Sequence, residues 1–242
     1  MVAKVNPFTQ LRLLDLARLD RDISNAEHRR RTLPELAMIT AGTNTVEELR
    51  GAAVLAQTEV SDLDRAGRKL DNEIDAVRAR AKRDAERIAS GAAPAKDLSN
   101  LQHEIQSLTR RQSVLEDEAL ELMERREVAD AALARLDGEL TSARTELEAA
   151  QSRRDDAFAD IDDGLERARV QRAEVAAGMP ADLLALYDRI YATGKIAAAP
   201  LRGSRCEACR MDLDRVALAE IHAAPDDVVV RCTECGAILV RS

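Results

Sequence analysis

The sequence predicts a mostly α protein, in which a long antiparallel coiled-coil hairpin is followed by a small C-terminal β module. Apolar residues follow a 3.5-residue repeat over much of the chain, and a short break that contains Gly91 and Pro94 divides this repeat into two arms. All four cysteines lie after residue 205. The composition agrees, because aromatic residues make up only 2% of the chain, and a compact core of this size normally uses many more.

The first arm contains two apolar series, at residues 16–33 and 46–88. Pro34 and Gly42 lie between them, and both residues interrupt helices. Thr45 is followed three residues later by Glu48, a spacing typical of a capping box at a new helix start. We therefore expect a break at about residues 33–45, as either a hinge or a rigid kink.

The second arm carries the clearest repeat, which begins at Leu98 and ends at Gly164. Steps of three and four residues alternate without a slip, and sixteen of the twenty positions are apolar. Such a repeat keeps one stripe of a helix against a partner helix and imposes a left-handed supercoil.

The segment at 90–97 separates the two arms. Gly91 favours a helix end, Pro94 prevents continuation, and Asp97 is a good N-cap for the next helix. The arms are similar in length, so residues 1–178 are predicted to fold as one antiparallel hairpin with its turn at about 90–97. A parallel dimer of two long helices is the alternative, and the short break and equal arms argue against it.

Residues 179–200 are predicted to form a short packing helix and a linker. Leu, Ile and Tyr residues between 182 and 193 are spaced for one buried face, and Gly194 ends the pattern. A module as small as the one that follows lacks a sufficient core of its own, so this helix is expected to supply apolar packing.

The cysteines form two Cys-x-x-Cys pairs, Cys206 with Cys209 and Cys232 with Cys235, separated by a 22-residue spacer. Two such pairs close a tetrahedral four-thiolate site, which leaves no open coordination position and is therefore structural. The pattern predicts one Zn²⁺ ion, with iron in a rubredoxin-like site as the alternative. Two disulfides or a redox pair would fit poorly with a reducing compartment and a duplicated motif.

The residues around the second pair predict the rest of this module. Segments 228–231 and 237–240 have the composition of two hairpin strands, and Gly236 suits a left-handed turn that aims backbone N–H groups at the thiolates. Residues 201–242 are thus predicted to form a four-cysteine zinc ribbon. Arg205 and Arg231 each precede a pair, either to offset the thiolate charge or as solvated surface residues.

The net charge of −8 gives no general attraction to nucleic acid or to an anionic membrane. The ribbon has six Arg against seven acids and no aromatic residue for base stacking, which argues against it as a reader of nucleic acid. The hairpin tip is instead basic, and we predict that it docks an acidic partner or a phosphate backbone. Pairing of these side chains with acids on the helix surface is the alternative. The candidate residues are Arg78, Arg80, Lys82, Arg83, Arg87, Arg110 and Arg111.

Several function classes are not supported by any pattern in the chain. No apolar run reaches the roughly 20 residues that span a bilayer, and residues 1–7 lack the apolar core of a signal peptide, so a cytoplasmic location is expected. We find no nucleophile elbow, phosphate loop or His/carboxylate cluster. We therefore expect neither an enzyme nor a small-molecule substrate.

The long hairpin, the segment Met179-Pro-Ala-Asp-Leu-Leu-Ala-Leu-Tyr187 and the ending Cys232-x-x-Cys-Gly-Ala-Ile-Leu239 together resemble the bacterial C4-type zinc ribbon domain proteins. The resemblance implies that Cys206, Cys209, Cys232 and Cys235 are the metal ligands. It also implies a non-enzymatic adaptor, since some relatives are described as partners of an alternative sigma factor and of flagellar or type III export components, and others as RNA-binding.

The expected function is a zinc-binding scaffold or adaptor that mediates protein–protein interactions through its coiled coil, linked to transcription or secretion machinery. The alternative is a regulatory protein that contacts DNA or RNA through the basic tip or the zinc ribbon.

Overall fold

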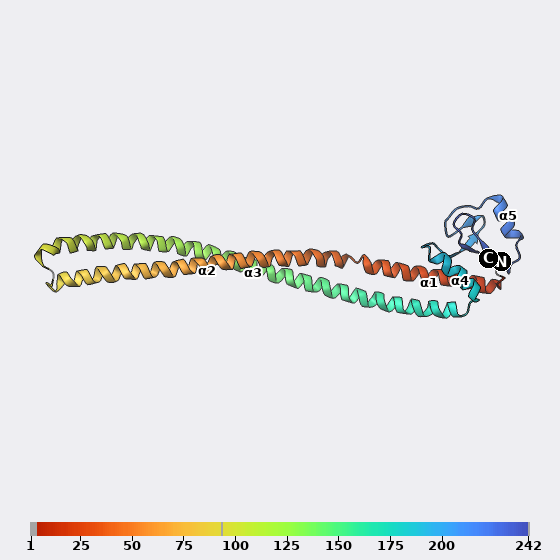
Figure 1. Ribbon diagram of the computed structural model, residues 1–242, viewed down its shortest axis with the longest axis horizontal. Coiled ribbons are helices and arrows are strands. Elements are labelled where there is room, and N and C mark those ends of the chain that lie inside the picture. Colours follow the sequence, from red (N-terminus) through yellow and green to blue (C-terminus); the bar gives the residue numbers. More distant parts are fainter. Residues whose placement is uncertain (1–3, 93, 242) are drawn as a thin grey trace. The chain divides into compact units, whose positions relative to one another are not determined.

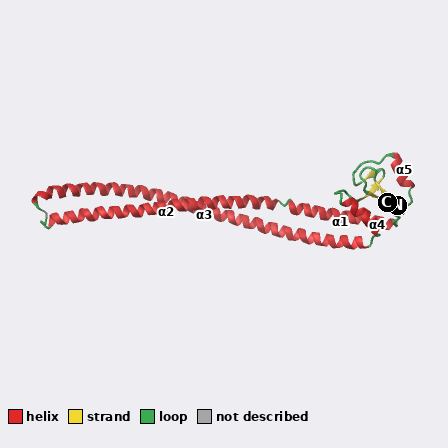
Figure 2. Cartoon of the chain, viewed as in Figure 1, coloured by secondary structure: helices red, strands yellow, loops and turns green. Residues whose placement is uncertain are grey.

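The computed structural model describes residues 4–92 and 94–241 (Figure 1). The chain divides into two compact units, one of residues 37–151 and the other of residues 1–36 with 152–242. Figure 2 shows that helices dominate and that the strands gather in one small sheet. The helices are α1 (Pro7–Arg31), α2 (Pro34–Ala89), α3 (Ala95–Ala177), α4 (Ala181–Tyr191) and α5 (Arg215–Ala223). The strands are β1 (Ala198–Arg202), β2 (Arg205–Cys206), β3 (Val230–Arg231) and β4 (Ile238–Val240).

In the unit of residues 37–151, α2 and α3 lie side by side in opposite directions. Along α3, the predicted seam is buried or half-buried at every position except Arg126. Val60, Leu63 and Ala129 form one buried cluster along this seam. Residues 90–94 connect the two helices, and residue 93, inside the predicted turn, lies outside the described residues. The antiparallel coiled-coil hairpin that the heptads predict is confirmed.

The predicted break at 33–45 is wrong in extent, because α2 already begins at Pro34 and runs without interruption through Gly42 and Thr45. Only Thr32 and Leu33 separate α1 from α2. Proline is tolerated in the first turn of a helix, where its missing N–H has no partner to lose. Gly42 lies within the helix beside Leu147, where a Cβ would lie 3.4 Å from Leu147 Cδ1. Thr45 caps nothing, because its hydroxyl donates to the Ala41 carbonyl within the helix.

In the other unit, α1 packs against the last part of α3. Ile23 and Leu33 share a buried cluster with Ile161 and Leu165. Beside it, the Arg30 guanidinium donates to Asp162 and lies 4.4 Å from the centre of the Phe158 ring. An aliphatic seam with charged flanks thus continues into this unit.

The sheet has the strand order β2-β1-β4-β3, with β1 parallel to β4 and the other two pairs antiparallel. The predicted hairpin strands are β3 and β4, with Val230 opposite Leu239. The predicted boundary at residue 200 is wrong, because β1 spans it and Ala198 pairs with Ile238 inside the sheet. Residues 198–200 are therefore part of the ribbon and not of a linker.

One buried core joins α1, α4 and the sheet. Leu13 and Leu16 from α1, Leu183 and Tyr187 from α4, and Ile238 from β4 are all essentially inaccessible to solvent. The metal-bearing segment thus draws its core from helices that lie before it in the chain. No helix of the described residues is both long and apolar enough to cross a membrane.

Candidate metal centre

The four cysteines converge at one point of the ribbon. Their sulfur atoms all lie within 4.8 Å of one another. Cys206 Sγ is 3.9 Å from Cys235 Sγ, and Cys209 Sγ is 3.9 Å from Cys232 Sγ. Four sulfurs at about 2.3 Å from a tetrahedral Zn²⁺ ion would be separated by about 3.8 Å, whereas a disulfide requires about 2.05 Å. The donor set therefore fits one zinc ion and no disulfide.

The two Cys-x-x-Cys pairs form matching turns. In the first, the N–H of Arg210 donates to the Cys206 carbonyl, and the N–H of Cys206 donates to the Met211 carbonyl. In the second, the N–H groups of Gly236 and Cys232 make the equivalent bonds, at 3.0 and 2.9 Å. The sheet brings the turns together, because the first follows β2 and the second lies between the paired strands β3 and β4.

Arg205 and Arg231 brace these turns from equivalent positions. Arg205 Nε donates to the Arg210 carbonyl at 3.0 Å, and Arg231 Nε donates to the Gly236 carbonyl at 2.9 Å. Neither expectation from sequence anticipated this role. The residue that follows each second cysteine is left-handed, with φ of 60° at Arg210 and 79° at Gly236. Gly236 adopts this conformation freely, whereas a residue with a Cβ is strained in it.

The environment acts differently on the individual thiols. Burial raises the pKa of the Cys206 thiol to about 12. Burial also opposes ionisation of Cys232, but N–H groups of Cys235 and Glu234 point at its sulfur, and the net effect lowers its pKa. Burial raises the pKa of Cys235. Because a coordinated thiol is deprotonated outright, a bound dication would supply the charge that lets all four sulfurs act as thiolates.

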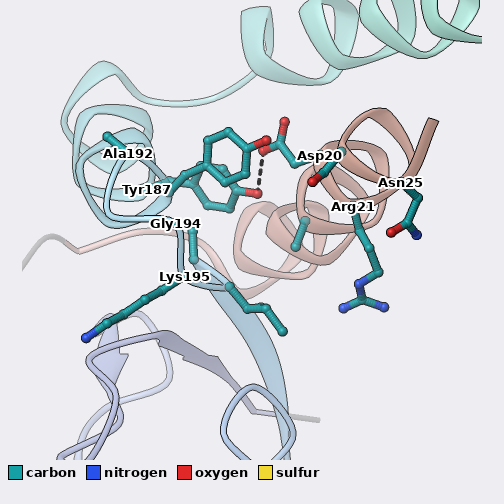
Figure 3. A pocket seen from close by; sticks show the side chains of 12 residues that line it. Asp20, Arg21, Asn25, Tyr187, Ala192, Gly194 and Lys195 are labelled. Atoms are coloured by element: carbon teal, nitrogen blue, oxygen red, sulfur yellow. Dashed lines mark hydrogen bonds between the residues drawn. The ribbon is translucent and has the colours of Figure 1, made fainter. Parts of the chain in front are cut away.

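A buried polar network lies on α1 and α4 of the same unit. The side chain of Asp20 is only 4% exposed and accepts a hydrogen bond from the Tyr187 hydroxyl at 2.7 Å (Figure 3). Arg172 Nε, from α3, donates to the same carboxylate at 2.5 Å, and its Nη2 reaches Asp188 at 3.0 Å. Burial and Asp20 raise the pKa of Tyr187, and Asp20 raises that of Arg172. The network ties three helices together.

The predicted basic tip lies in the other unit, and the structure splits its residues into two groups. Arg78 pairs with Glu116, Arg80 with Glu104, Lys82 with Glu86, and Arg111 with Glu73. In the described part of the chain, the other candidates make no ion pair. They are Arg83, Arg87 and Arg110. Three of the four pairs cross between α2 and α3, so much of the predicted positive charge is compensated.

Two parts of the chain match known protein families. Residues 16–195 match the CT398-like coiled coil hairpin domain, and residues 205–239 match the C4-type zinc ribbon domain. The second match and the cluster of four sulfurs support a structural zinc ion.

Similar proteins share nearly the full length of the chain. The uncharacterized protein Rv2229c of Mycobacterium tuberculosis is 42% identical over 235 residues, which cover 96% of this chain and 95% of that protein. The uncharacterized protein ML1638 of Mycobacterium leprae is 35% identical over 224 residues, covering 92% and 96%.

Solved structures share the fold of this chain. A Mycobacterium smegmatis structure has a TM-score of 0.86 at 36% identity and covers 99% of this chain and 100% of that one. CT398 of Chlamydia trachomatis has a TM-score of 0.56 at 16% identity, covers 97% of this chain and 95% of its own, and shows the fold alone. The chain belongs to the CT398-like coiled-coil hairpin family and carries a C4-type zinc ribbon.

Proposed function

We propose that this protein is a non-enzymatic adaptor whose coiled coil docks a helix of a protein partner, while one zinc ion held by Cys206, Cys209, Cys232 and Cys235 keeps the ribbon folded. The observation that carries the docking proposal is an apolar hollow on the side of the hairpin unit. The adaptor would work in the cytoplasm, where thiols stay reduced and available to the metal.

The hollow measures about 310 Å³ and lies between α2 and α3. Gly67 occupies a seam position in α2, and a Cβ there would meet only Leu122 Cδ2, at 3.8 Å. The missing side chain leaves space that Leu63 and Leu122 line from either helix. At its edge, Met123 is 59% exposed and the neighbouring Leu120 is 60% exposed. Large exposed apolar residues beside a hollow in a coiled coil are a suitable seat for apolar anchors of another helix.

The charged residues around the hollow indicate which kind of partner helix would bind there. Asp64 and Arg126 pair across it, and this contact raises the pKa of Arg126. Arg68 and Asp71 also line it and make no ion pair in the residues that the structure describes. One free cation and one free anion suit an amphipathic helix with charges of both signs beside its apolar stripe.

The experiment is affinity capture from the native bacterium with intact protein, with and without nuclease. Met123→Glu should abolish capture of the partners that wild type retains after nuclease, because a carboxylate would enter the apolar lining of the hollow. Val114→Glu is the matched control, since Val114 is 48% exposed on the same helix and does not line the hollow. Equal capture by both variants would show that the hollow is not the docking site.

The basic tip supports a second candidate function, contact with DNA or RNA, because Arg83, Arg87 and Arg110 are exposed and make no ion pair in the described residues. Reversing these three charges should reduce binding of a short RNA duplex and flatten its salt dependence. Reversing the paired residues Arg78 and Arg80 should have a smaller effect, because their charge is already compensated. No measurable duplex binding by wild type at low salt would end this alternative.

A further inference from the structure

A basic groove runs along α1 and the start of the ribbon, entirely within the unit of residues 1–36 and 152–242. It consists of two cavities, of about 400 and about 670 Å³, which share Ala17, Arg21 and Ile196 in their linings. The groove lies outside the zinc cluster and the hollow on the hairpin unit. Neither of those two sites accounts for a groove with a basic rim at this place.

The floor of the groove is aliphatic and its rim is cationic. Leu14 and Ala17 of α1, Ala198, and the partly buried Pro200 of β1 form the floor. The rim carries Arg18, Arg21, Lys195, Arg202 and Arg210. In Figure 3, Arg21 from α1 and Lys195 from the segment after α4 lie on opposite flanks of the first cavity.

Little negative charge compensates this rim. Asp20 lines the first cavity, but its carboxylate already accepts bonds from Tyr187 and Arg172. Glu207 is the other acid in the lining. Arg18 approaches Asp22 at 3.9 Å, in a contact that is mostly exposed. Within the described residues, the remaining four cations of the rim make no ion pair. A local excess of positive charge on a chain of net charge −8 marks a surface that attracts anionic groups.

We propose that this groove binds an acidic peptide segment of a partner protein, with carboxylates on the arginines and small aliphatic side chains on the floor. Guanidinium groups bind carboxylates with two parallel hydrogen bonds, which gives direction as well as strength. The inference does not depend on the proposed docking of a helix on the hairpin, because the two surfaces share no residue.

The chemistry of the floor favours a peptide over a nucleic acid. Single strands are held largely by stacking of bases on exposed aromatic rings. The aromatic rings of the groove are Tyr187, which is fully buried, and Tyr191, which already stacks on Tyr187 with ring centres 6.4 Å apart. An aliphatic floor complements Ala, Val or Leu side chains better than it complements bases.

The test is selection of a random 12-residue peptide library on the intact zinc-loaded protein, followed by affinity measurements on the enriched peptides. These should carry several acidic residues interspersed with aliphatic ones. Arg21→Glu/Arg202→Glu should weaken their binding at least about tenfold, through lost ion pairs and new repulsion. Arg153→Glu/Arg167→Glu is the matched control and should leave binding unchanged, because both arginines are exposed on α3 of the same unit and line neither cavity.

A milder variant, Arg21→Gln/Lys195→Gln, guards against misfolding and should weaken binding about threefold. Enrichment without acidic residues, or equal loss in the groove and control variants, would overturn the proposal. Tighter binding of a 12-nucleotide oligouridylate that displaces the peptides and is lost in the groove variant would also overturn it, in favour of a nucleic-acid surface. Because the hollow is intact in these variants, failure here leaves the capture experiment on the hairpin unaffected.

Discussion

The two units of this protein are stabilised in different ways. The unit of residues 37–151 has one seam in which similar aliphatic side chains recur at heptad positions, so each contact is small and resembles the next. The other unit has an apolar core and seam as well, but it also depends on a few special groups: the sulfur cluster, the Asp20 carboxylate and the two left-handed turn residues. Repetition spreads stability over many residues, whereas single groups concentrate it. The loss of one of these groups should therefore strongly destabilise the second unit.

Removal of zinc by a strong chelator tests this difference with the largest expected effect. Structural zinc contributes on the order of 10 kcal/mol to the folding of small zinc modules. We expect the ribbon amides to lose their protection from hydrogen exchange. Helicity from α2 and α3 should persist, because their seam does not involve the metal. Hydrogen exchange with mass spectrometry measures both at once, and simultaneous loss of protection in both units would contradict the comparison.

Asp20→Ala should lower the free energy of unfolding by about 3 kcal/mol, because it leaves Arg172 and the buried Tyr187 hydroxyl without their shared acceptor. Asp15→Ala, on the exposed face of the same helix, should change it by less than about 0.5 kcal/mol. Chemical denaturation of the zinc-loaded protein measures both values. Equal effects would show that the network adds no stability.

The two turns of the metal centre give a matched pair of substitutions. Gly236→Ala should cost about 1–2 kcal/mol, because φ is 79° and the new Cβ would lie 3.0 Å from Arg231 Nη2. Arg210→Gly at the equivalent position should instead stabilise the ribbon by up to about 1 kcal/mol, by relieving a left-handed residue. Thermal unfolding of the zinc-loaded variants shows whether each substitution raises or lowers the stability. The same sign for both would mean that the turns are not equivalent.

In the hairpin unit, Asp84 occupies a seam position and is only 9% exposed. It makes no hydrogen bond or ion pair in the described residues, so Asp84→Leu should raise the free energy of unfolding by about 1 kcal/mol. Glu59→Leu on the exposed face of α2 should leave it nearly unchanged. Chemical denaturation measures both free energies of unfolding. Destabilisation by Asp84→Leu would point to a role for the carboxylate that packing does not explain.

The sequence predicted those features that are set by short-range periodicity. The heptads identified the buried stripe of α3, and the spacing of the cysteines identified the sulfur cluster, because both patterns repeat within a few residues. Strand β1 escaped prediction, since the segment Ala198–Arg202 contains a proline and no alternation, and its parallel partner lies about forty residues further along the chain. Nothing in the sequence around Asp20 indicated that Tyr187 would be its hydrogen-bond partner.

Counting charges along the sequence does not reveal groupings that the fold assembles from distant segments. Residues 201–242 have slightly more acids than arginines, and this balance argued against the ribbon as a reader of nucleic acid. In the structure, Arg202 and Arg210 join Arg18 and Arg21 from α1 and Lys195 from the segment after α4. No window of the sequence contains that grouping.

The connectivity of the units has a consequence for how this protein can vary. The N–H of Val5 donates to the Asp227 carbonyl, and Gln10 bonds to the carbonyls of Val5 and Asp226, so early and late parts of the chain fold into one body. Residues 37–151 are an insertion into that body. Deleting seven residues from each arm would return every seam position to register. Evolution can therefore change the reach of the hairpin in steps of one heptad, while the zinc ribbon and its groove are inherited unchanged.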